Sequence, residues 1–187
     1  GSGISLIGGG AATPPAALDN GQMERLVDTS DDWIKTRTGI RERRIAGADS
    51  TLTGLGTAAA RKALEMAGVS AADLDLIIFA TSTPDDLFGS AAAIQGQLGA
   101  SQAVSFDLTA AGSGFLFGLV TAAQYIRTGV YKRVLLIGAD VLSRWVDWSD
   151  RRTCILFGDG AGAVVLEASE QDQLLGFEMR SNGAGNC

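Results

Sequence analysis

The sequence predicts an α/β fold in which a mixed, mostly parallel β-sheet is arranged around a buried helix. Short apolar runs with β-strand character alternate with longer helical segments, as in successive strand–helix units. The run at 76–80 (LIIFA) is apolar throughout, which is typical of a central parallel strand. A helix expected from Gly112 to about Gly129 is apolar on nearly every side, which indicates a place in the interior of the domain.

The chain is expected to open with one strand and two short helices. Residues 3–9 (GISLIGG) form the apolar run of the first strand. After a loop, residues 21–27 predict a short helix. Thr29 or Ser30 then caps a second helix, which ends at Gly39.

The later elements alternate between helix and strand until the last three, which are all strands. Strands that follow one another without a helix between them are expected to pair antiparallel, so the sheet should be mixed. The length suggests one domain, residues 1–187, in which Gly1 and Ser2 resemble the remnant of a removed tag. The expected helices are at 53–67, 90–98 and 112–129. The expected strands are at 76–80, 104–106, 133–139 and 174–180, with a further strand that ends at Val165.

A corner of small residues, 107–111, joins the strand at 104–106 to the buried helix. Ligands of parallel sheets gather at the carboxyl ends of the strands, where this corner lies. The first helical turn, Gly112 to Gly114, has no bulky side chain over its unpaired N–H groups, so it favours a negative charge. An enzyme would place a thiolate or a developing oxyanion there. The alternative is that close packing of helix on strand requires small residues at this point.

No nucleophile is evident at this corner. Ser113 is a poor candidate, because a G-x-S-x-G elbow would need glycine where Ala111 and Phe115 stand. The chain also contains no histidine, which removes the usual general base and the usual metal ligand. We therefore expect that this chain alone does not complete a catalytic site.

Composition and charge exclude several classes of protein. The net charge of −6 and the pI of about 4.6 argue against a nucleic-acid partner. No apolar run approaches the length of a membrane span and no signal segment is evident, so a soluble cytoplasmic protein is expected. The two cysteines, Cys154 and Cys187, form no C-x-x-C pair, so neither a disulfide framework nor a zinc site is expected. Cys154 stands in an apolar run and is expected in the core.

Five cations gather in sequence near Trp33, on an otherwise acidic protein. Guanidinium groups beside an indole ring suit a phosphorylated nucleotide, with the cations on its phosphates and the ring under a purine. The alternative, equally open from the pattern, is an ordinary solvated face paired with Asp28, Asp31 and Asp32. The five cations are Lys35, Arg37, Arg41, Arg43 and Arg44.

Two glycine clusters offer a much weaker hypothesis, a nucleotide-dependent oxidoreductase. Residues 8–10 (GGG) follow the first strand, but Thr13 stands where a dinucleotide fingerprint needs Gly or Ala, and Pro14 delays any helix. Residues 158–162 (GDGAG) lack the lysine of a phosphate-binding loop. The cluster at 8–10 therefore resembles a dinucleotide site only superficially, and the cluster at 158–162 is better interpreted as a backbone turn before a strand.

Five separated motifs resemble the β-ketoacyl-acyl carrier protein synthase III family, which are condensing enzymes of the thiolase fold. The resemblance implies that this chain is one half of a duplicated, layered α/β sandwich. The motifs are VDTSDDWIKTRTGIRERRI (27–45), ATSTPDDLF (80–88), FDLTAAGSGF (106–115), IGADVLSR (137–144) and DRRTCILFGDGAGAVVL (150–166).

The resemblance also implies a reaction and a set of site residues. A cysteine at the start of the buried helix takes the acyl group of acetyl-CoA, and malonyl-acyl carrier protein then decarboxylates and attacks the thioester, which begins type II fatty acid synthesis. The enzyme is expected to be a cytoplasmic homodimer that uses CoA thioesters as substrates and needs no further cofactor and no metal. Trp33 and Arg151 would sandwich the adenine of CoA, Thr29 would bind the nucleotide, and Arg37 would contact its phosphates. Phe88 would reach across the dimer into the partner's acyl pocket.

The chain departs from this family in two ways. Gly112 stands where the family has its nucleophilic cysteine, so the first half-reaction should be lost. The family's catalytic His and Asn come from a second half of the fold, before which this chain stops, at Cys187. We therefore expect another polypeptide, or the remainder of the same one, to complete the fold. The alternative function is a non-catalytic subunit that binds CoA or an acyl chain.

Overall fold

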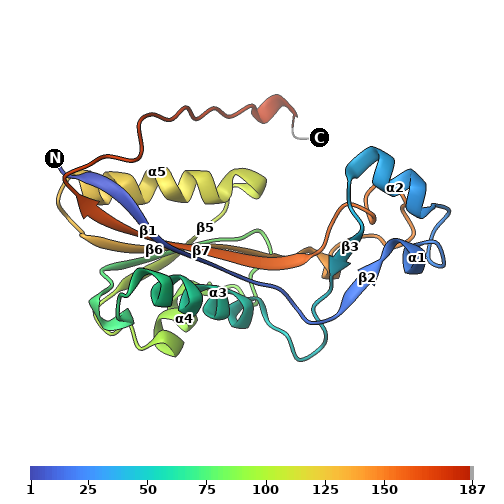
Figure 1. Ribbon diagram of the computed structural model, residues 1–187, viewed down its shortest axis with the longest axis horizontal. Coiled ribbons are helices and arrows are strands. Elements are labelled where there is room, and N and C mark those ends of the chain that lie inside the picture. The colour runs from blue at the N-terminus through green and yellow to red at the C-terminus, as the bar shows by residue number, and fades with distance from the viewer. Residues whose placement is uncertain (186–187) are drawn as a thin grey trace.

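The computed structural model describes residues 1–185 and consists of a layered α/β body with a small projecting part (Figure 1). Cys187 lies outside the described residues. The strands are β1 (Gly3–Ala12), β2 (Ala17–Asp19), β3 (Glu42–Arg44), β4 (Leu76–Ala80), β5 (Val104–Leu108), β6 (Arg133–Val141) and β7 (Asp159–Ser169). The α-helices are α1 (Asn20–Met23), α2 (Asp31–Thr38), α3 (Leu52–Ala67), α4 (Ala91–Leu98) and α5 (Gly114–Arg127).

The body is built on a five-stranded sheet with the order β1-β7-β6-β4-β5. β4 pairs in parallel with both β5 and β6, while β7 pairs antiparallel with both β6 and β1. All strands of this sheet except β7 therefore point in one direction. The predicted mixed sheet is confirmed, including the antiparallel pairing of β6 with β7, which follow each other without a helix between them.

Helices cover both faces of this sheet. Figure 1 shows α3 and α4 on one face and α5 on the other. The fully apolar strand β4 is buried along its whole length, because its alternate side chains enter the two hydrophobic cores on opposite faces. No helix within residues 1–185 is both long and apolar enough to cross a bilayer.

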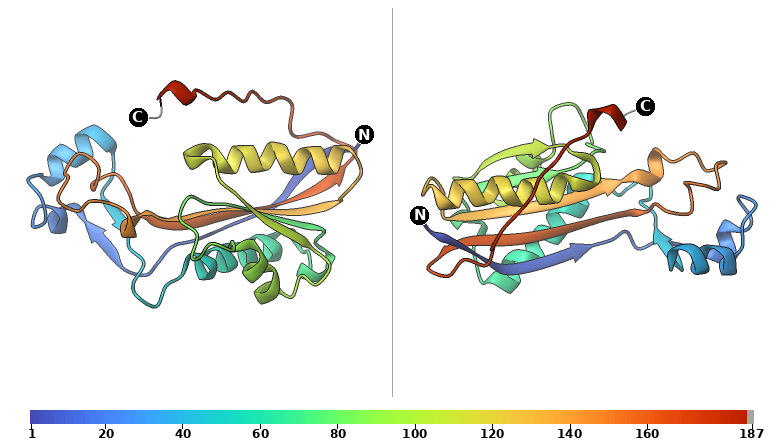
Figure 2. Two further views of the ribbon diagram at one scale, coloured as in Figure 1. Left: turned by 180° about the vertical axis from the view of Figure 1, so that it is seen from behind. Right: turned by 90° about the horizontal axis from the view of Figure 1, so that it is seen from above.

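The expectation that the helix after Gly112 is buried on all sides is wrong for this chain. The face of α5 toward the sheet is buried at Gly118, Ala122 and Ile126, whereas Leu116 on the outer face is 61% exposed. The physical reason is that no helix or sheet of residues 1–185 packs on the outer face. Only the extended last residues pass on that side, as the two views of Figure 2 show.

The strand expected at 174–180 is also absent. The segment is extended, and its alternate apolar side chains Leu175 and Phe177 are exposed, so it has a strand-like pattern without a sheet to join. Side chains already occupy the open edge of β1: the N–H of Ile4 donates to Asp172 and the N–H of Leu6 donates to Gln173. Edge donors satisfied in this way leave no place for another strand.

The projecting part contains a small two-stranded sheet that the sequence did not predict. β2 and β3 are three residues each and pair antiparallel, and the sequence of β3 is wholly charged. They lie beside α1 and α2, which pack on a third core formed by Met23, Ile34, Cys154 and Ile155. The helix expected at 21–27 is shorter, Asn20–Met23, with a capping box between Asp19 and Gln22.

The glycines at 8–10 lie within β1 and bring the strand against α3. A β-carbon at Gly10 would lie 2.6 Å from the Ala63 nitrogen, and one at Gly8 would lie 2.9 Å from the Ala67 nitrogen. Gly9 points the other way, with its nearest atom at 3.8 Å. Gly8 and Gly10 therefore serve close packing of this strand against α3.

We predict that Gly10→Ala destabilises the protein by about 1–3 kcal/mol, because the added methyl group meets rigid helix backbone. The matched control is Gly9→Ala, which has room for the methyl group and should change the free energy of unfolding by less than about 1 kcal/mol. Denaturant unfolding of both variants gives the two values. Equal losses in the two variants would contradict the packing role of Gly10.

Candidate active site

The corner between β5 and α5 is the expected site of the chemistry. β5 ends at Leu108, a turn of 3₁₀ helix covers Ala111–Ser113, and α5 begins at Gly114. Ala111 has a φ of +48°, and within residues 1–185 it is the single residue other than glycine with a positive φ. Such a conformation costs about 1–3 kcal/mol and is often found at functional sites.

A hollow of about 390 Å³ lies in front of this corner. Its position agrees with the expected one, since Ala80 ends β4, Asp140 lies near the end of β6, and both line the hollow. A β-carbon at Gly112 would have no atom within 4 Å, so a larger side chain fits there. The other lining residues are Ala111, Gly112, Phe115, Gly138, Ala139, Gly158, Gly160 and Gly162.

The loop at 81–90 stands beside the hollow and is tied down by carboxylates from neighbouring elements. Asp140 Oδ1 accepts hydrogen bonds from the Thr81 and Thr83 hydroxyls at 3.1 and 2.9 Å. Asp107, on β5, accepts a hydrogen bond from the N–H of Ser90 at 2.9 Å and so caps the N-terminus of α4. Between these fixed ends, Phe88 projects into solvent with 93% of its surface exposed.

Asp85, in the middle of the same loop, anchors it to the start of α3. Its carboxylate accepts the N–H groups of Leu52 and Thr53 at 3.1 and 2.9 Å. Burial raises the pKa of Asp85, but the hydrogen bonds from Thr53 and Leu52 outweigh it, so the net shift of the pKa is downward. The loop is therefore held by an ionised side chain at a helix N-terminus.

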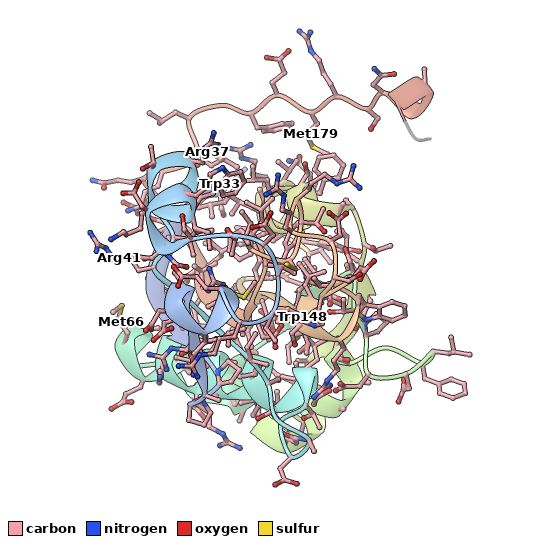
Figure 3. The ribbon with its side chains drawn as sticks, turned by 90° about the vertical axis from the view of Figure 1, so that its right-hand side faces the viewer. Trp33, Arg37, Arg41, Met66, Trp148 and Met179 are labelled. Atoms are coloured by element: carbon pink, nitrogen blue, oxygen red, sulfur yellow. The ribbon has the colours of Figure 1, made fainter. Side chains whose placement is uncertain are left out.

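The second predicted site lies at Trp33 on α2. The Arg37 guanidinium lies 4.4 Å from the centre of the indole ring, and the Arg151 guanidinium lies 5.9 Å from it. Figure 3 shows Trp33 and Arg37 next to each other on the projecting part. The hydroxyl oxygen of Thr29 is shielded from water and has no hydrogen-bond partner among residues 1–185. We name Trp33 with Arg37 and Arg151 the indole clamp.

The five cations near Trp33 do not form one patch. Lys35 pairs with Asp31 at 2.7 Å, and the hydrogen bond from Lys35, followed by that from Asn20, lowers the pKa of Asp31. Arg44 lies 3.3 Å from a carboxylate oxygen of Glu42. These pairs match the alternative of a solvated, paired face. The remaining three are Arg37 over the indole, the exposed Arg41 and the buried Arg43.

Cys154 is a core residue, as predicted. Its side chain is fully buried, and burial raises the pKa of its thiol. A buried thiol with a raised pKa is a poor nucleophile.

The oxidoreductase hypothesis has no support in the backbone. The cluster at 8–10 lies in β1, and residues 159–162 form the start of β7, where they pair with β1 and β6. A dinucleotide site needs a glycine turn between a strand and a helix, and neither cluster makes one.

Comparisons with known proteins agree on one family. The family model described as 3-Oxoacyl-[acyl-carrier-protein (ACP)] synthase III matches residues 106–183. A β-ketoacyl-[acyl-carrier-protein] synthase III of Nostoc sp. is 64% identical over 184 residues, which are 98% of this chain and 56% of that protein. The protein of the same name in Synechococcus elongatus is 64% identical over 187 residues, 100% of this chain and 56% of the relative.

Solved structures give the same result. The crystal structure of 3-oxoacyl-[acyl-carrier-protein] synthase III from Aquifex aeolicus VF5 is 51% identical, with a TM-score of 0.88 over 90% of this chain and 55% of that one. The priming β-ketosynthase of the R1128 polyketide pathway is 38% identical, with a TM-score of 0.89 over 91% of this chain and 52% of that one. The chain spans about half the length of the relatives it matches. It belongs to the β-ketoacyl-[acyl-carrier-protein] synthase III family, in which it corresponds to the N-terminal half, and it has the thiolase-like fold of that family.

Proposed function

We propose that this chain forms the N-terminal half of an acyltransferase that condenses acetyl-CoA with malonyl-acyl carrier protein to start type II fatty acid synthesis. The observation that carries the proposal is the placement of position 112, at the start of α5, against the hollow at the carboxyl ends of β4 and β6. We propose a cytoplasmic homodimer that uses CoA thioesters and needs no further cofactor. A second half of the fold would cover the outer face of α5 and supply the catalytic Asn and the catalytic His, a residue type that this sequence lacks.

The proposed reaction assigns two tasks to the corner at position 112. A thiolate there would attack the thioester carbonyl, and the CoA thiolate would leave as the acyl group is transferred. A backbone N–H at the same place would stabilise the oxyanion that forms in between. Gly112 has the N–H but no thiol, so we propose that the chain with Gly112 performs no acyl transfer onto itself.

The proposed binding site for the nucleotide part of CoA is the indole clamp. Arg151 supplies a cation and Trp33 supplies an aromatic face, and the two come from different segments of the chain. An adenine ring would fit between such a pair. Arg37 would bind phosphate. The Thr29 hydroxyl, which has no partner among residues 1–185, would donate a hydrogen bond to the nucleotide or accept one from it. The exposed tip at Phe88 supports a role outside its own subunit, in the partner's acyl pocket.

A second candidate function is a non-catalytic subunit that binds CoA or an acyl chain. One observation favours it: the corner has glycine in place of the nucleophile while the indole clamp keeps its three side chains together. In this case CoA would bind, and no covalent intermediate would form at any stage.

The proposed reaction is tested by Gly112→Cys in the full-length protein. The open space at this position should accommodate the thiol, and the start of α5 should lower its pKa, so incubation with acetyl-CoA should add the mass of one acetyl group. The parent protein should show no adduct in the same mass measurement. A control that also carries Cys154→Ser should still be acetylated, because Cys154 is buried. A stable adduct on the parent that disappears in Gly112→Ala would overturn the proposal for position 112.

A further prediction concerns CoA binding at the indole clamp. Trp33→Ala should weaken CoA binding by about 1–3 kcal/mol, or roughly 5–150-fold in Kd, because a base-stacking face is lost. Calorimetry on the full-length protein would measure this change. Trp145→Ala is the matched control, since Trp145 is an exposed tryptophan on the short turn after β6. An equal loss of affinity in both variants would argue against the clamp, and absence of CoA binding to the parent would refute both candidate functions.

A further inference from the structure

Arg43 is a buried cation without an anionic partner. Its side chain belongs to β3 and only 5% of its surface is exposed, yet within residues 1–185 no carboxylate lies at salt-bridge distance from it. Its guanidinium donates to Leu18 O at 2.9 Å, to Asn20 Oδ1 at 2.8 Å and to Ile155 O at 3.3 Å. Burial lowers the pKa of Arg43, because the charged form loses its hydration. A charge kept at this cost without a counter-ion calls for a reason beyond stability.

Asn20 extends this arrangement to both ends of α2. Only 1% of its surface is exposed, and while its oxygen accepts from Arg43, its amide nitrogen has two acceptors. One is Asp31 Oδ1, at the first residue of α2, at 3.0 Å. The other is Ile40 O, two residues beyond the end of α2, at 2.8 Å. Asn20 therefore fixes the helix that carries Trp33 at its two ends.

Ile155 connects the same arrangement to the segment of Arg151. A hydrogen bond from the Cys154 N–H to Asp150 O at 3.0 Å closes the turn that contains Arg151, directly before Ile155. A continuous path of hydrogen bonds thus runs from Ile155 O through Arg43 and Asn20 to α2. This path joins segments that are far apart in the sequence, since Arg43 and Ile155 are separated by 112 positions.

The two halves of the indole clamp lie on the two segments that this path joins. Trp33 belongs to α2, and Arg151 comes four positions before Ile155, yet the direct link between them is weak. Arg151 donates one hydrogen bond to Asp28 O at 3.1 Å and lies 3.4 Å from the Asp28 carboxylate, and the Asp28 side chain is almost fully exposed. An exposed ion pair of this kind contributes about 0–1 kcal/mol and does not fix geometry. The planar guanidinium of Arg43, with donors in a rigid fork, can hold three acceptors in fixed directions.

We infer that Arg43 and Asn20 are positioning residues that set the spacing between Trp33 and Arg151 and thereby the affinity for the nucleotide part of CoA. The inference rests on the proposed function, because it assumes that the indole clamp binds the adenine of CoA. Neither residue touches the ligand in this account. Both act through the two segments that carry the clamp.

The test compares Arg43→Met, Arg43→Lys and Arg44→Met in the full-length protein. Calorimetry measures the affinity of each variant for CoA and for pantetheine, which lacks the nucleotide. Arg43→Met should weaken CoA binding about tenfold, the size of one weakened stacking contact, and should leave pantetheine binding unchanged. Arg43→Lys keeps a donor and should restore part of the loss. Arg44→Met, the neighbouring cation on β3, should bind both ligands as the parent does.

A second variant keeps the test decisive if Arg43→Met does not fold. Asn20→Asp retains an oxygen acceptor for Arg43 but removes both donors toward α2, so it should also lose CoA affinity and not pantetheine affinity. A folded Arg43→Met or Asn20→Asp that binds CoA like the parent would overturn the inference. Equal losses for CoA and pantetheine would overturn it too, since they would indicate a general structural role. If the parent binds CoA and Trp33→Ala weakens it, such results leave the proposed function standing; if the parent binds no CoA, the proposed function itself fails and the inference with it.

Discussion

The close approach of α5 to the sheet determines where the candidate active site lies. A β-carbon at Gly118 would lie 2.6 Å from Leu136 Cδ1, and one at Gly114 would lie 3.4 Å from Ala80 Cβ. A side chain at position 118 would have to displace the Leu136 side chain, whereas a β-carbon at position 114 would make an ordinary contact, so the absence of a side chain at Gly118 lets the helix lie this close to β6. Because α5 is one continuous helix, its position on the sheet also determines the position of its N-terminus and of the corner at position 112. The small residues of α5 are therefore needed for packing and for placing the site, and the two roles suggested by its sequence do not exclude each other.

Carboxylates at the ends of strands hold the loops around the hollow. A loop cannot satisfy its N–H groups by strand pairing, so it needs acceptors from elsewhere. Asp159, at the start of β7, supplies them to Ala46 N at 2.7 Å and to Ser143 N at 2.9 Å, while Asp140 and Asp107 do the same for the loop at 81–90. Charge-assisted hydrogen bonds are about twice as strong as neutral ones, which suits connections that must keep a fixed geometry. The hollow thus has a rigid sheet on one side and anchored loops on the other.

The sequence was sufficient for the elements that carry a strong local pattern. The apolar run of β4, the end of α2 at Gly39 and the corner before Gly112 could all be located from residue types and spacing, and the N-cap of α2 was limited to Thr29 or Ser30, of which the structure has Ser30. These features depend on neighbours in the chain, so a local pattern records them.

What could not be predicted depends on contacts between distant segments. The strand pattern at 174–180 was present, but a strand also needs a sheet edge, and the edge of β1 is occupied by Asp172 and Gln173. Arg43 appeared in sequence as one of five equivalent cations, whereas its burial follows from Leu18, Asn20 and Ile155 O coming together around it. The only signal in the sequence for β3 was the apolar Ile45 after three charged residues, which is too weak to indicate a strand.

The indole clamp and the corner at position 112 are built from separate elements, and this separation bears on the meaning of Gly112. The clamp depends on α2, β3 and the segment before Ile155, all in the projecting part, whereas the corner depends on β5, α5 and the body of the sheet. A β-carbon at position 112 would have no atom within 4 Å, so glycine there leaves no contact of a β-carbon unmade. In the proposed function, glycine at this position removes the thiol and leaves the contacts of the indole clamp, which lie on other elements, in place. In the proposed function, CoA binding at the clamp and acyl transfer at position 112 depend on separate elements, so the loss of one would not require the loss of the other.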